Sequence, residues 1–240
     1  MNPLTLAVDG ERATLTLTRP EKRNAQDPEL WRALTEAGRS VPGSVRVVVV
    51  RGEGVSFSAG LDRAQLGLLG ELGQDPGAEE RIAGFQGAFT WLGRPDLVSV
   101  AAVQGHAIGA GFQLALACDL RVAAAGTVFS MKETTLGIVP DLTGTHPLVM
   151  SVGLPRALEW CLTGRAVSAE EALAAGMLNA VVDDLDSAVE SLVSAVLASP
   201  RDAVIETKAL LQGAARRTPP EQWKAEREAQ ARVLRDRAGG

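Results

Sequence analysis

The sequence predicts an α/β fold that ends in a helical region, and three observations support this class. Apolar runs typical of strands alternate with amphipathic segments typical of helices from Leu4 to Val182. Two of the apolar runs lead directly into glycine-rich loops, and the chain beyond residue 186 has a helical pattern. We therefore expect a core domain over residues 1–198 and a C-terminal helical region over residues 199–240.

The composition is that of an ordinary soluble globular protein, with 240 residues, 46% hydrophobic content and a net charge of −5. Acidic and basic residues are interspersed, so neither a nucleic acid nor a membrane surface is expected as a partner. Residues 1–12 lack the regions of a signal peptide, and no segment reaches the roughly 18 apolar residues of a membrane span. Cys118 and Cys161 have no metal-type spacing, so we expect buried free thiols, no metal and a cytoplasmic setting.

The N-terminal residues predict a β-hairpin followed by a basic loop and a helix. Apolar residues alternate with polar ones on both sides of an Asp9-Gly10 turn. Arg19–Ala25 is a polar, basic loop that could face a phosphate. Asp27-Pro28 suits the N-cap and first position of a helix. The residues expected to point inward from this helix are Leu30, Trp31, Leu34 and Ala37.

The next section alternates strands with less regular segments. Val45–Val50 is a β-branched run typical of a strand buried on both faces, and it leads into the glycine-rich loop Gly52–Asp62. Leu66–Gly77 is rich in Gly and Leu without a clear period, which favours a flexible lid or a pocket wall. We expect a helix over Ala78–Gly93 and a second buried strand over Leu97–Val103.

The most informative stretch is Gly105–Asp119, where closely spaced glycines lead into an apolar run. Glycine permits a tight turn and a close backbone approach, so we expect a turn that opens a buried helix. The first N–H groups of such a helix have no partner within it, and its dipole favours negative charge there. An anion is therefore expected at this helix start.

The remaining elements alternate up to residue 182 and are then helical. A loop over Met131–Asp141 places two acids among glycine and proline, and Ser168 with Glu171 forms a capping box. The expected strands are Leu120–Ala125, Thr127–Ser130 and Leu178–Val182, and the expected helices are Pro155–Thr163, Ser168–Ala174, Asp186–Ala198, Pro200–Gln212 and Pro219–Arg237.

Several motifs occur together in a specific order. They are RPEKRNA, GEGVSFSAGLD, QGHAIGAGFQLALACDLRVA, LGIVPDLTG and LTGRAVSAEEALAAGMLNAVV. In this order they resemble the crotonase (enoyl-CoA hydratase/isomerase) superfamily from about Leu4 to Val182. The resemblance implies an α/β, crotonase-like spiral of ββα units with a C-terminal helical trimerisation region, and assembly as a homotrimer or a dimer of trimers.

The resemblance also implies an acyl-CoA thioester as substrate, with coenzyme A belonging to the substrate and no separate cofactor. The thioester oxygen would accept hydrogen bonds from the backbone N–H groups of Leu61 and Ala110, which would stabilise an enolate. The residues implied to contact the substrate or its CoA portion are Arg19, Lys22, Arg23, Ala25, Ala59, Gly60, Asp62 and Gly109.

The implied catalytic positions are Gln113, Glu133 and Asp141. Family members that hydrate a double bond use two glutamates, which fall here on Gln113 and Glu133. An amide cannot transfer a proton, and a missing acid or base typically costs about 10²- to 10⁴-fold in rate. The Glu133–Asp141 spacing resembles that of dienoyl-CoA isomerases, so we expect double-bond isomerisation. The alternatives are an enoyl-CoA hydratase of fatty-acid β-oxidation and a non-catalytic acyl-CoA-binding protein. For Asp141, an N-cap of a helix beginning at Leu142 remains an alternative role.

Two other classes fit poorly. A dinucleotide fold would need a third glycine after GAGFQL and an acid about twenty residues further on, and both are missing. A Ser-His-Asp hydrolase could recruit Ser58 with His106 or His146, but the chain has no GxSxG elbow.

Overall fold

The central feature of the fold is a six-stranded sheet. A computed structural model describes residues 2–239, with side chains up to residue 237. The strands run in the order β1-β2-β3-β4-β6-β9. β1 and β2 are antiparallel, as expected for the hairpin, and each later strand lies parallel to its neighbour. The strands are β1 (Leu4–Asp9), β2 (Arg12–Leu17), β3 (Val47–Gly52), β4 (Val98–Val103), β6 (Leu120–Ala124) and β9 (Ala180–Val182).

A second, three-stranded sheet has the order β5-β7-β8. Its strands are β5 (His106–Ile108), β7 (Val128–Ser130) and β8 (Val167–Ser168). β5 lies between Gly105 and Gly109, so the glycine turn does not open the helix directly. A short strand comes first, and the helix α4 (Ala110–Ala117) follows it.

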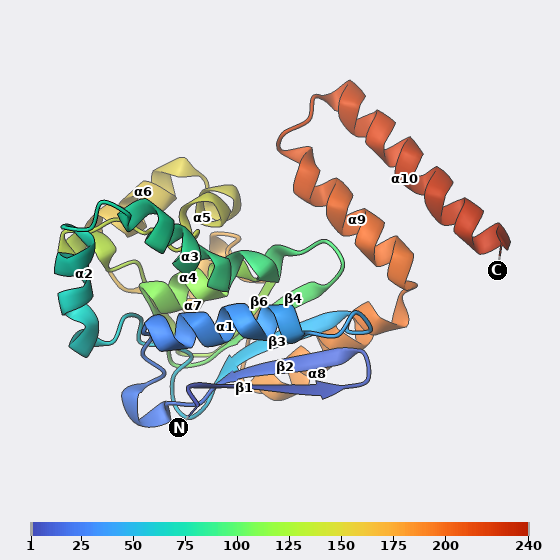
Figure 1. The fold of residues 1–240 in the computed structure, drawn as a ribbon. Helices are drawn as coiled ribbons and strands as arrows, with labels where there is room; N and C mark the ends of the chain where they lie inside the picture. The colour runs from blue at the N-terminus through green and yellow to red at the C-terminus, as the bar shows by residue number, and fades with distance from the viewer. Residues whose placement is uncertain (1, 240) are drawn as a thin grey trace.

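Helices cover both faces of the main sheet and extend beyond it (Figure 1). Short 3-10 turns occur at Pro20–Lys22, Arg63–Gln65, Trp91–Gly93 and Glu133–Leu136. The remaining α-helices are α1 (Pro28–Ser40), α2 (Leu66–Leu72), α3 (Ala78–Thr90), α5 (Thr145–Val152), α6 (Leu154–Thr163), α7 (Ala169–Ala174), α8 (Leu185–Ala198), α9 (Arg201–Ala214) and α10 (Pro219–Gly239).

Side-chain caps begin several of these helices. The Asp27 carboxylate accepts a hydrogen bond from the Leu30 N–H, and the Ser168 hydroxyl accepts one from the Glu171 N–H, as the sequence predicts. The capping box is only half formed, because the Glu171 carboxylate pairs with Arg165. The alternative role of Asp141 as a helix cap is wrong, because no helix begins at Leu142 and α5 starts at Thr145.

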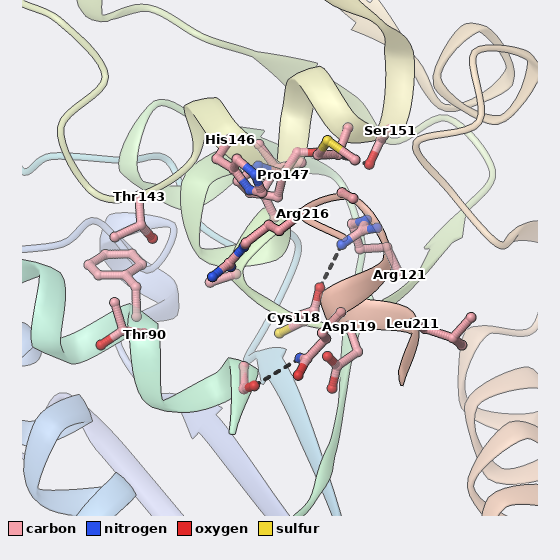
Figure 2. A pocket seen from close by; sticks show the side chains of 17 residues that line it. Thr90, Cys118, Asp119, Arg121, Thr143, His146, Pro147, Ser151, Leu211 and Arg216 are labelled. Atoms are coloured by element: carbon pink, nitrogen blue, oxygen red, sulfur yellow. Dashed lines mark hydrogen bonds between the residues drawn. The ribbon is translucent and has the colours of Figure 1, made fainter. Parts of the chain in front are cut away.

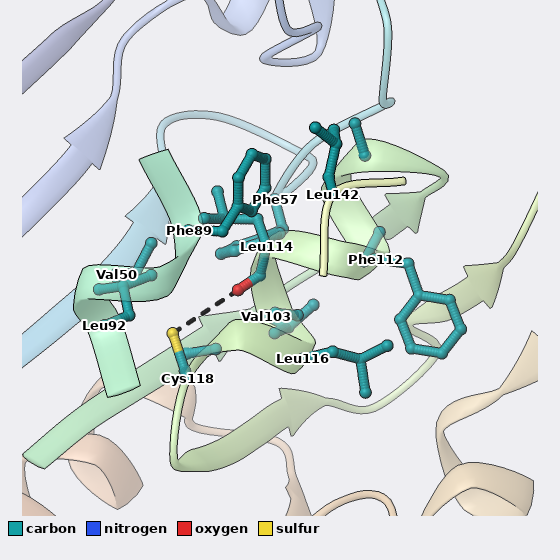
Figure 3. Packing of buried hydrophobic residues seen from close by; sticks show 14 of the residues in the cluster. Val50, Phe57, Phe89, Leu92, Val103, Phe112, Leu114, Leu116, Cys118 and Leu142 are labelled. Atoms are coloured by element: carbon teal, nitrogen blue, oxygen red, sulfur yellow. Dashed lines mark hydrogen bonds between the residues drawn. The ribbon is translucent and has the colours of Figure 1, made fainter. Parts of the chain in front are cut away.

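The predicted burial of β3 on both faces is confirmed. Val48 and Val50 pack into the larger core, which also contains α1, α3 and α4, whereas Val47 and Val49 pack against α8. Figure 3 shows part of the larger core, where Cys118 lies among leucine and phenylalanine side chains. Burial raises the pKa of the Cys118 thiol to about 12. Both cysteines are free thiols, but Cys161 is only half-buried.

The C-terminal helices α9 and α10 form an antiparallel pair that extends away from the sheet (Figure 1). Lys208 of α9 fastens this pair to the core. Its ammonium group donates to the carbonyls of Arg94 and Leu97 at 2.6 and 2.7 Å and to the Asp119 carboxylate at 2.7 Å. Across residues 2–239, none of the helices has the length and apolar character needed to cross a membrane.

Candidate active site

The two glycine-rich loops expected to stabilise an anion lie against each other. The Ser58 N–H donates to the His106 carbonyl at 2.9 Å, and the Ile108 N–H donates to the Ser58 carbonyl at 3.0 Å. Gly60 has a φ of +83°, and a Cβ there would lie 2.4 Å from the Ile108 oxygen and 3.6 Å from the Ala110 nitrogen. Only glycine fits this contact, which brings the two loops together.

The backbone N–H groups of Leu61 and Ala110 come from these two loops. Within residues 2–239, neither group donates a hydrogen bond to the protein. Ala110 is the first residue of α4, so the helix dipole adds positive potential at its N–H group. These two groups can therefore receive a negatively charged oxygen between the loops.

A cavity of about 380 Å³ opens beside the two loops. Its wall includes Ala59–Leu61 from the first loop and Ile108–Ala110 from the second. The segment expected as a lid or wall contributes a helix, α2, whose leucines line the cavity, so the wall is confirmed. The remaining lining residues are Trp31, Arg63, Leu66, Leu68, Leu69, Leu72, Phe85, Lys132, Glu133, Thr135, Leu136, Ile138, Asp141 and Leu142. Such a predominantly apolar cavity with few polar groups is typical of a small-molecule site.

Glu133 lines this cavity with a largely buried carboxylate, 6% exposed. One oxygen, Oε1, accepts a hydrogen bond from Gln113 Nε2 at 2.7 Å, whereas the buried Oε2 has no partner within the described residues. A Cβ at Gly109 would lie 3.2 Å from Oε1, so the carboxylate lies close to the start of α4. Burial raises the pKa of Glu133, the hydrogen bond from Gln113 opposes this, and the charge of Asp141 adds to the rise. A carboxylate of this kind can exchange a proton with a ligand in the cavity.

Gln113 is fully buried on α4, and its amide binds protein groups on both sides. Nε2 donates to Glu133, and Oε1 accepts from the Leu142 N–H at 2.9 Å and the Gly144 N–H at 3.2 Å. The amide therefore fixes the acid and the loop after Asp141 in one arrangement. The sequence motif locates Gln113, but its partners depend on the tertiary structure.

Asp141 is half-buried and lines the same cavity as Glu133. Burial raises the pKa of its carboxyl group. Its backbone carbonyl accepts a hydrogen bond from Gln86 Nε2 of α3 at 2.7 Å, which ties the loop to this helix. A second acid is thus present at the cavity, as the spacing from Glu133 predicts.

The basic loop reaches the cavity rim through its backbone. The Ala59 N–H donates to the Arg23 carbonyl at 2.8 Å, and the Ala25 N–H donates to the Lys22 carbonyl at 3.1 Å. The Arg23 side chain is exposed, and Ala25 is buried.

Two of the loop's cations pair with carboxylates of the protein. Arg19 pairs with Asp27 and, at 2.7 Å, with Asp62, and the ammonium group of Lys22 lies 3.0 Å from Asp62. The Lys22 contact and the Ala64 N–H hold the pKa of Asp62 below its ordinary value. Arg19 has a clear structural role here, and contact of these residues with CoA stays a prediction.

A second cavity of about 490 Å³ lies between the core and α9 (Figure 2). Its buried cation, Arg121, donates to the backbone carbonyls of Cys118 and Met177 at 2.6 and 2.8 Å, and its carboxylate, Asp119, pairs with Lys208. His146 also lines this cavity. Because its central charges are satisfied by the protein and the two glycine loops lie elsewhere, we place the candidate active site at Glu133.

Trp31 and Phe85 are cavity residues that the sequence pattern does not indicate. Trp31 was expected in the core, and Phe85 lies within a predicted helix, yet both line the cavity at Glu133. Their helical spacing is that of ordinary core residues, so no local signal distinguishes them.

A family model and several similar proteins all indicate the same protein family. Residues 11–237 match the family model described as enoyl-CoA hydratase/isomerase. "Probable enoyl-CoA hydratase EchA14" of Mycobacterium tuberculosis is 34% identical over 216 residues, covering 89% of this chain and 83% of the relative. "(E)-benzylidenesuccinyl-CoA hydratase" of Thauera aromatica is 35% identical over 193 residues, covering 75% and 70%.

A solved structure from Thermobifida fusca, described as a "putative enoyl-CoA hydratase" in complex with CoA, is also similar. It is 44% identical with a TM-score of 0.93 and covers 100% of this chain and 95% of that chain. This match confirms the expected α/β fold with its C-terminal helical region. The names of these relatives support the hydratase alternative better than the isomerisation that the sequence analysis preferred.

Proposed function

The chain belongs to the enoyl-CoA hydratase/isomerase family, and we propose that it adds water across the α,β double bond of an enoyl-CoA ester. One observation carries the proposal. The Glu133 carboxylate lines the same cavity as the Leu61 and Ala110 loops; Gln113 holds its Oε1, and its Oε2 has no partner among residues 2–239. This arrangement places one acid/base group in the same cavity as a pair of donors that can stabilise an anion.

The reaction needs only one carboxylate that changes its protonation state twice. Glu133 takes a proton from water as the water oxygen bonds to the β carbon, and the double-bond electrons move to the thioester oxygen. The Leu61 and Ala110 N–H groups stabilise the resulting enolate, at a scale of roughly 3–4 kcal/mol for one such donor. Glu133 then returns its proton to the α carbon, so the enzyme ends in its starting state.

The chemistry of the cavity agrees with this substrate class. Its apolar wall suits an acyl chain, and burial raises the pKa of Glu133, which makes the carboxylate a better match for proton transfer near neutral pH. Two Thermobifida fusca structures that this chain resembles are described with CoA and with acetoacetyl-CoA. We extend CoA thioester binding to this chain on that basis.

Double-bond isomerisation is the second candidate, and Asp141 favours it. Asp141 and Glu133 line one cavity, and its charge contributes to the raised pKa of Glu133. A pair of acids on one cavity could move a proton between two carbons of the acyl chain. In that case, Asp141 would exchange protons with the substrate as well.

The test uses conjugated and non-conjugated enoyl-CoA esters in water labelled with heavy oxygen. We expect the wild-type protein to place labelled oxygen on the β carbon, and Glu133→Gln to lower the rate by about 10²- to 10⁴-fold. Glutamine at this position keeps an oxygen to accept the bond from Gln113, so the fold is preserved. Asp141→Asn is the matched control and should keep most of the hydration rate.

Each of the other possible results would assign a different function to the chain or a different role to Glu133. Movement of the double bond without label, lost in Asp141→Asn, would establish isomerisation. Binding of every ester without turnover would establish the binding protein that the sequence analysis left open. Rapid hydration by Glu133→Gln would overturn the assignment of this acid.

A further inference from the structure

An aromatic pair separates the cavity at Glu133 from a groove on the protein surface. Trp31 of α1 and Phe85 of α3 line both the inner cavity and an outer groove of about 650 Å³. Their ring centroids lie 4.7 Å apart, with the planes tilted by 48°. Since α1 and α3 pack side by side (Figure 1), the two rings form the wall between the helices.

The two sides of this wall differ in chemistry. The inner side is lined by the leucines of α2 together with Ile138 and Leu142. The outer groove also has apolar residues in its wall, but it adds charged side chains of α1 and α3, including Arg32, Glu36 and Arg81. An apolar chain that starts at Glu133 therefore meets the two rings before it can reach the outer groove.

The Trp31 half of the wall is fixed in place. Its indole N–H donates to Gln26 Oε1 at 2.9 Å, and Gln26 Nε2 donates to the Ser58 hydroxyl at 3.2 Å. Trp31 is 5% exposed, and Gln26 and Ser58 are fully buried. Ser58 belongs to the first glycine loop, so Trp31 is tied to the same backbone that presents the Leu61 N–H. The wall thus has a defined position relative to the reacting end of the substrate.

We propose that the Trp31–Phe85 pair closes the far end of the acyl cavity and sets the longest acyl chain that the enzyme accepts. This inference rests on the proposed function, because it takes the inner cavity as the acyl site. Each methylene that enters an apolar cavity tightens binding by about fourfold. Affinity for CoA esters should therefore rise with chain length, and then stop rising once the chain meets the two rings.

Removing one ring should join the inner cavity to the outer groove. Phe85 is the better target because it is half-buried and has no polar group, whereas Trp31 carries a hydrogen bond. In Phe85→Ala, an acyl chain can pass between α1 and α3. We expect the ratio of affinities for a long and a short acyl chain to increase by tenfold or more relative to the wild-type protein.

The experiment measures binding of saturated acyl-CoA esters with butanoyl to hexadecanoyl chains by calorimetry, which needs no turnover. The kcat/KM values for the matching enoyl esters are measured in parallel. Ile82→Ala is the matched control, because Ile82 is a half-buried residue of the same helix that lines neither cavity. Phe85→Leu serves as a second variant that keeps more of the packing between α1 and α3.

The expected result is a break in the wild-type chain-length profile that Ile82→Ala preserves and Phe85→Ala moves to longer chains, with Phe85→Leu in between. The inference would be overturned by a wild-type profile without a break. It would also be overturned if folded Phe85→Ala and Phe85→Leu both kept the break at the wild-type chain length. A shifted break in binding without any turnover would support the wall and refute the proposed hydration. Turnover with an unshifted break in binding would support the proposed hydration and refute the wall.

Discussion

The hydrogen bonds of Gln113 lead to a prediction for Gln113→Leu. Leucine has a similar size but cannot form the bonds of the amide. The substitution removes the donor to Glu133 Oε1 and the acceptor for the Leu142 and Gly144 N–H groups. All of these groups lie on residues that are buried in the fold. Their bonds cannot be replaced by bulk water without local opening.

Gln113→Leu should change both the free energy of unfolding and the pH dependence of kcat/KM. A buried N–H group without a partner costs about 1–3 kcal/mol, so losing two should lower the free energy of unfolding by about 2–6 kcal/mol. The bond from Gln113 lowers the pKa of Glu133, so its loss should raise that pKa further. A base is active only when it is deprotonated. The acid limb of the kcat/KM profile should therefore move to higher pH.

The assay combines denaturant unfolding with hydration rates measured across pH. Gln113→Glu is the matched comparison, because its carboxylate can still accept from the Leu142 and Gly144 N–H groups. It places a second negative charge near Glu133, so its acid limb should also move to higher pH, with a smaller loss of stability. If folded Gln113→Leu shows the acid limb of the wild-type protein, Gln113 does not control the pKa of Glu133.

Three other substitutions test the contact between the glycine loops, the attachment of α9 by Lys208 and the exposed side of α6. Gly60→Ala puts a Cβ 2.4 Å from the Ile108 oxygen and should lower kcat by about 10²- to 10³-fold, whereas Gly67→Ala, at an open position, should match the wild-type rate. Equal rates for both would refute the loop contact. Lys208→Met removes the cation that pairs with Asp119, whose carboxylate keeps its hydrogen bonds from Ser99, and should destabilise the fold by about 3–5 kcal/mol in denaturant unfolding. An unchanged unfolding midpoint would show that Lys208 does not fasten α9 to the core. Leu154, Leu158 and Leu162 are exposed along one side of α6. We predict that the expected trimer buries this side, so Leu162→Arg should lower the mass measured by light scattering, and an unchanged mass would exclude this contact.

Sequence patterns predicted the parts of the fold that local chemistry controls. The hairpin follows from alternation around Asp9-Gly10, and its register pairs Leu4 with Leu17 as a two-residue turn requires. The caps at Asp27 and Ser168 follow from side chains that bond the nearest free N–H groups. Glu133 and Asp141 follow from the motif, and both line the cavity.

Other features depend on contacts between distant residues. The strand β5 has three residues, too few to show a period, and it is held by pairing with β7. The leucines of α2 show no helical period in sequence, because the helix has only seven residues and its leucines are not all on the packed side: Leu68 is buried, whereas Leu66 is exposed. The basic loop indicates a phosphate contact, but Arg19 pairs with Asp27 and Asp62, which the sequence places 8 and 43 residues away.

The amide at position 113 supplies a donor to Glu133 at every pH, whereas a carboxyl group there would donate only when protonated. It donates to Glu133 and accepts from two backbone N–H groups at the same time, and an ionised carboxylate cannot donate. A second charge 2.7 Å from Oε1 would be disfavoured by about 6 kcal/mol at an effective dielectric constant of about 20, so the pair would hold a proton at neutral pH. With Gln113 in place, Glu133 can ionise alone, which is the state of the base that the proposed addition of water requires.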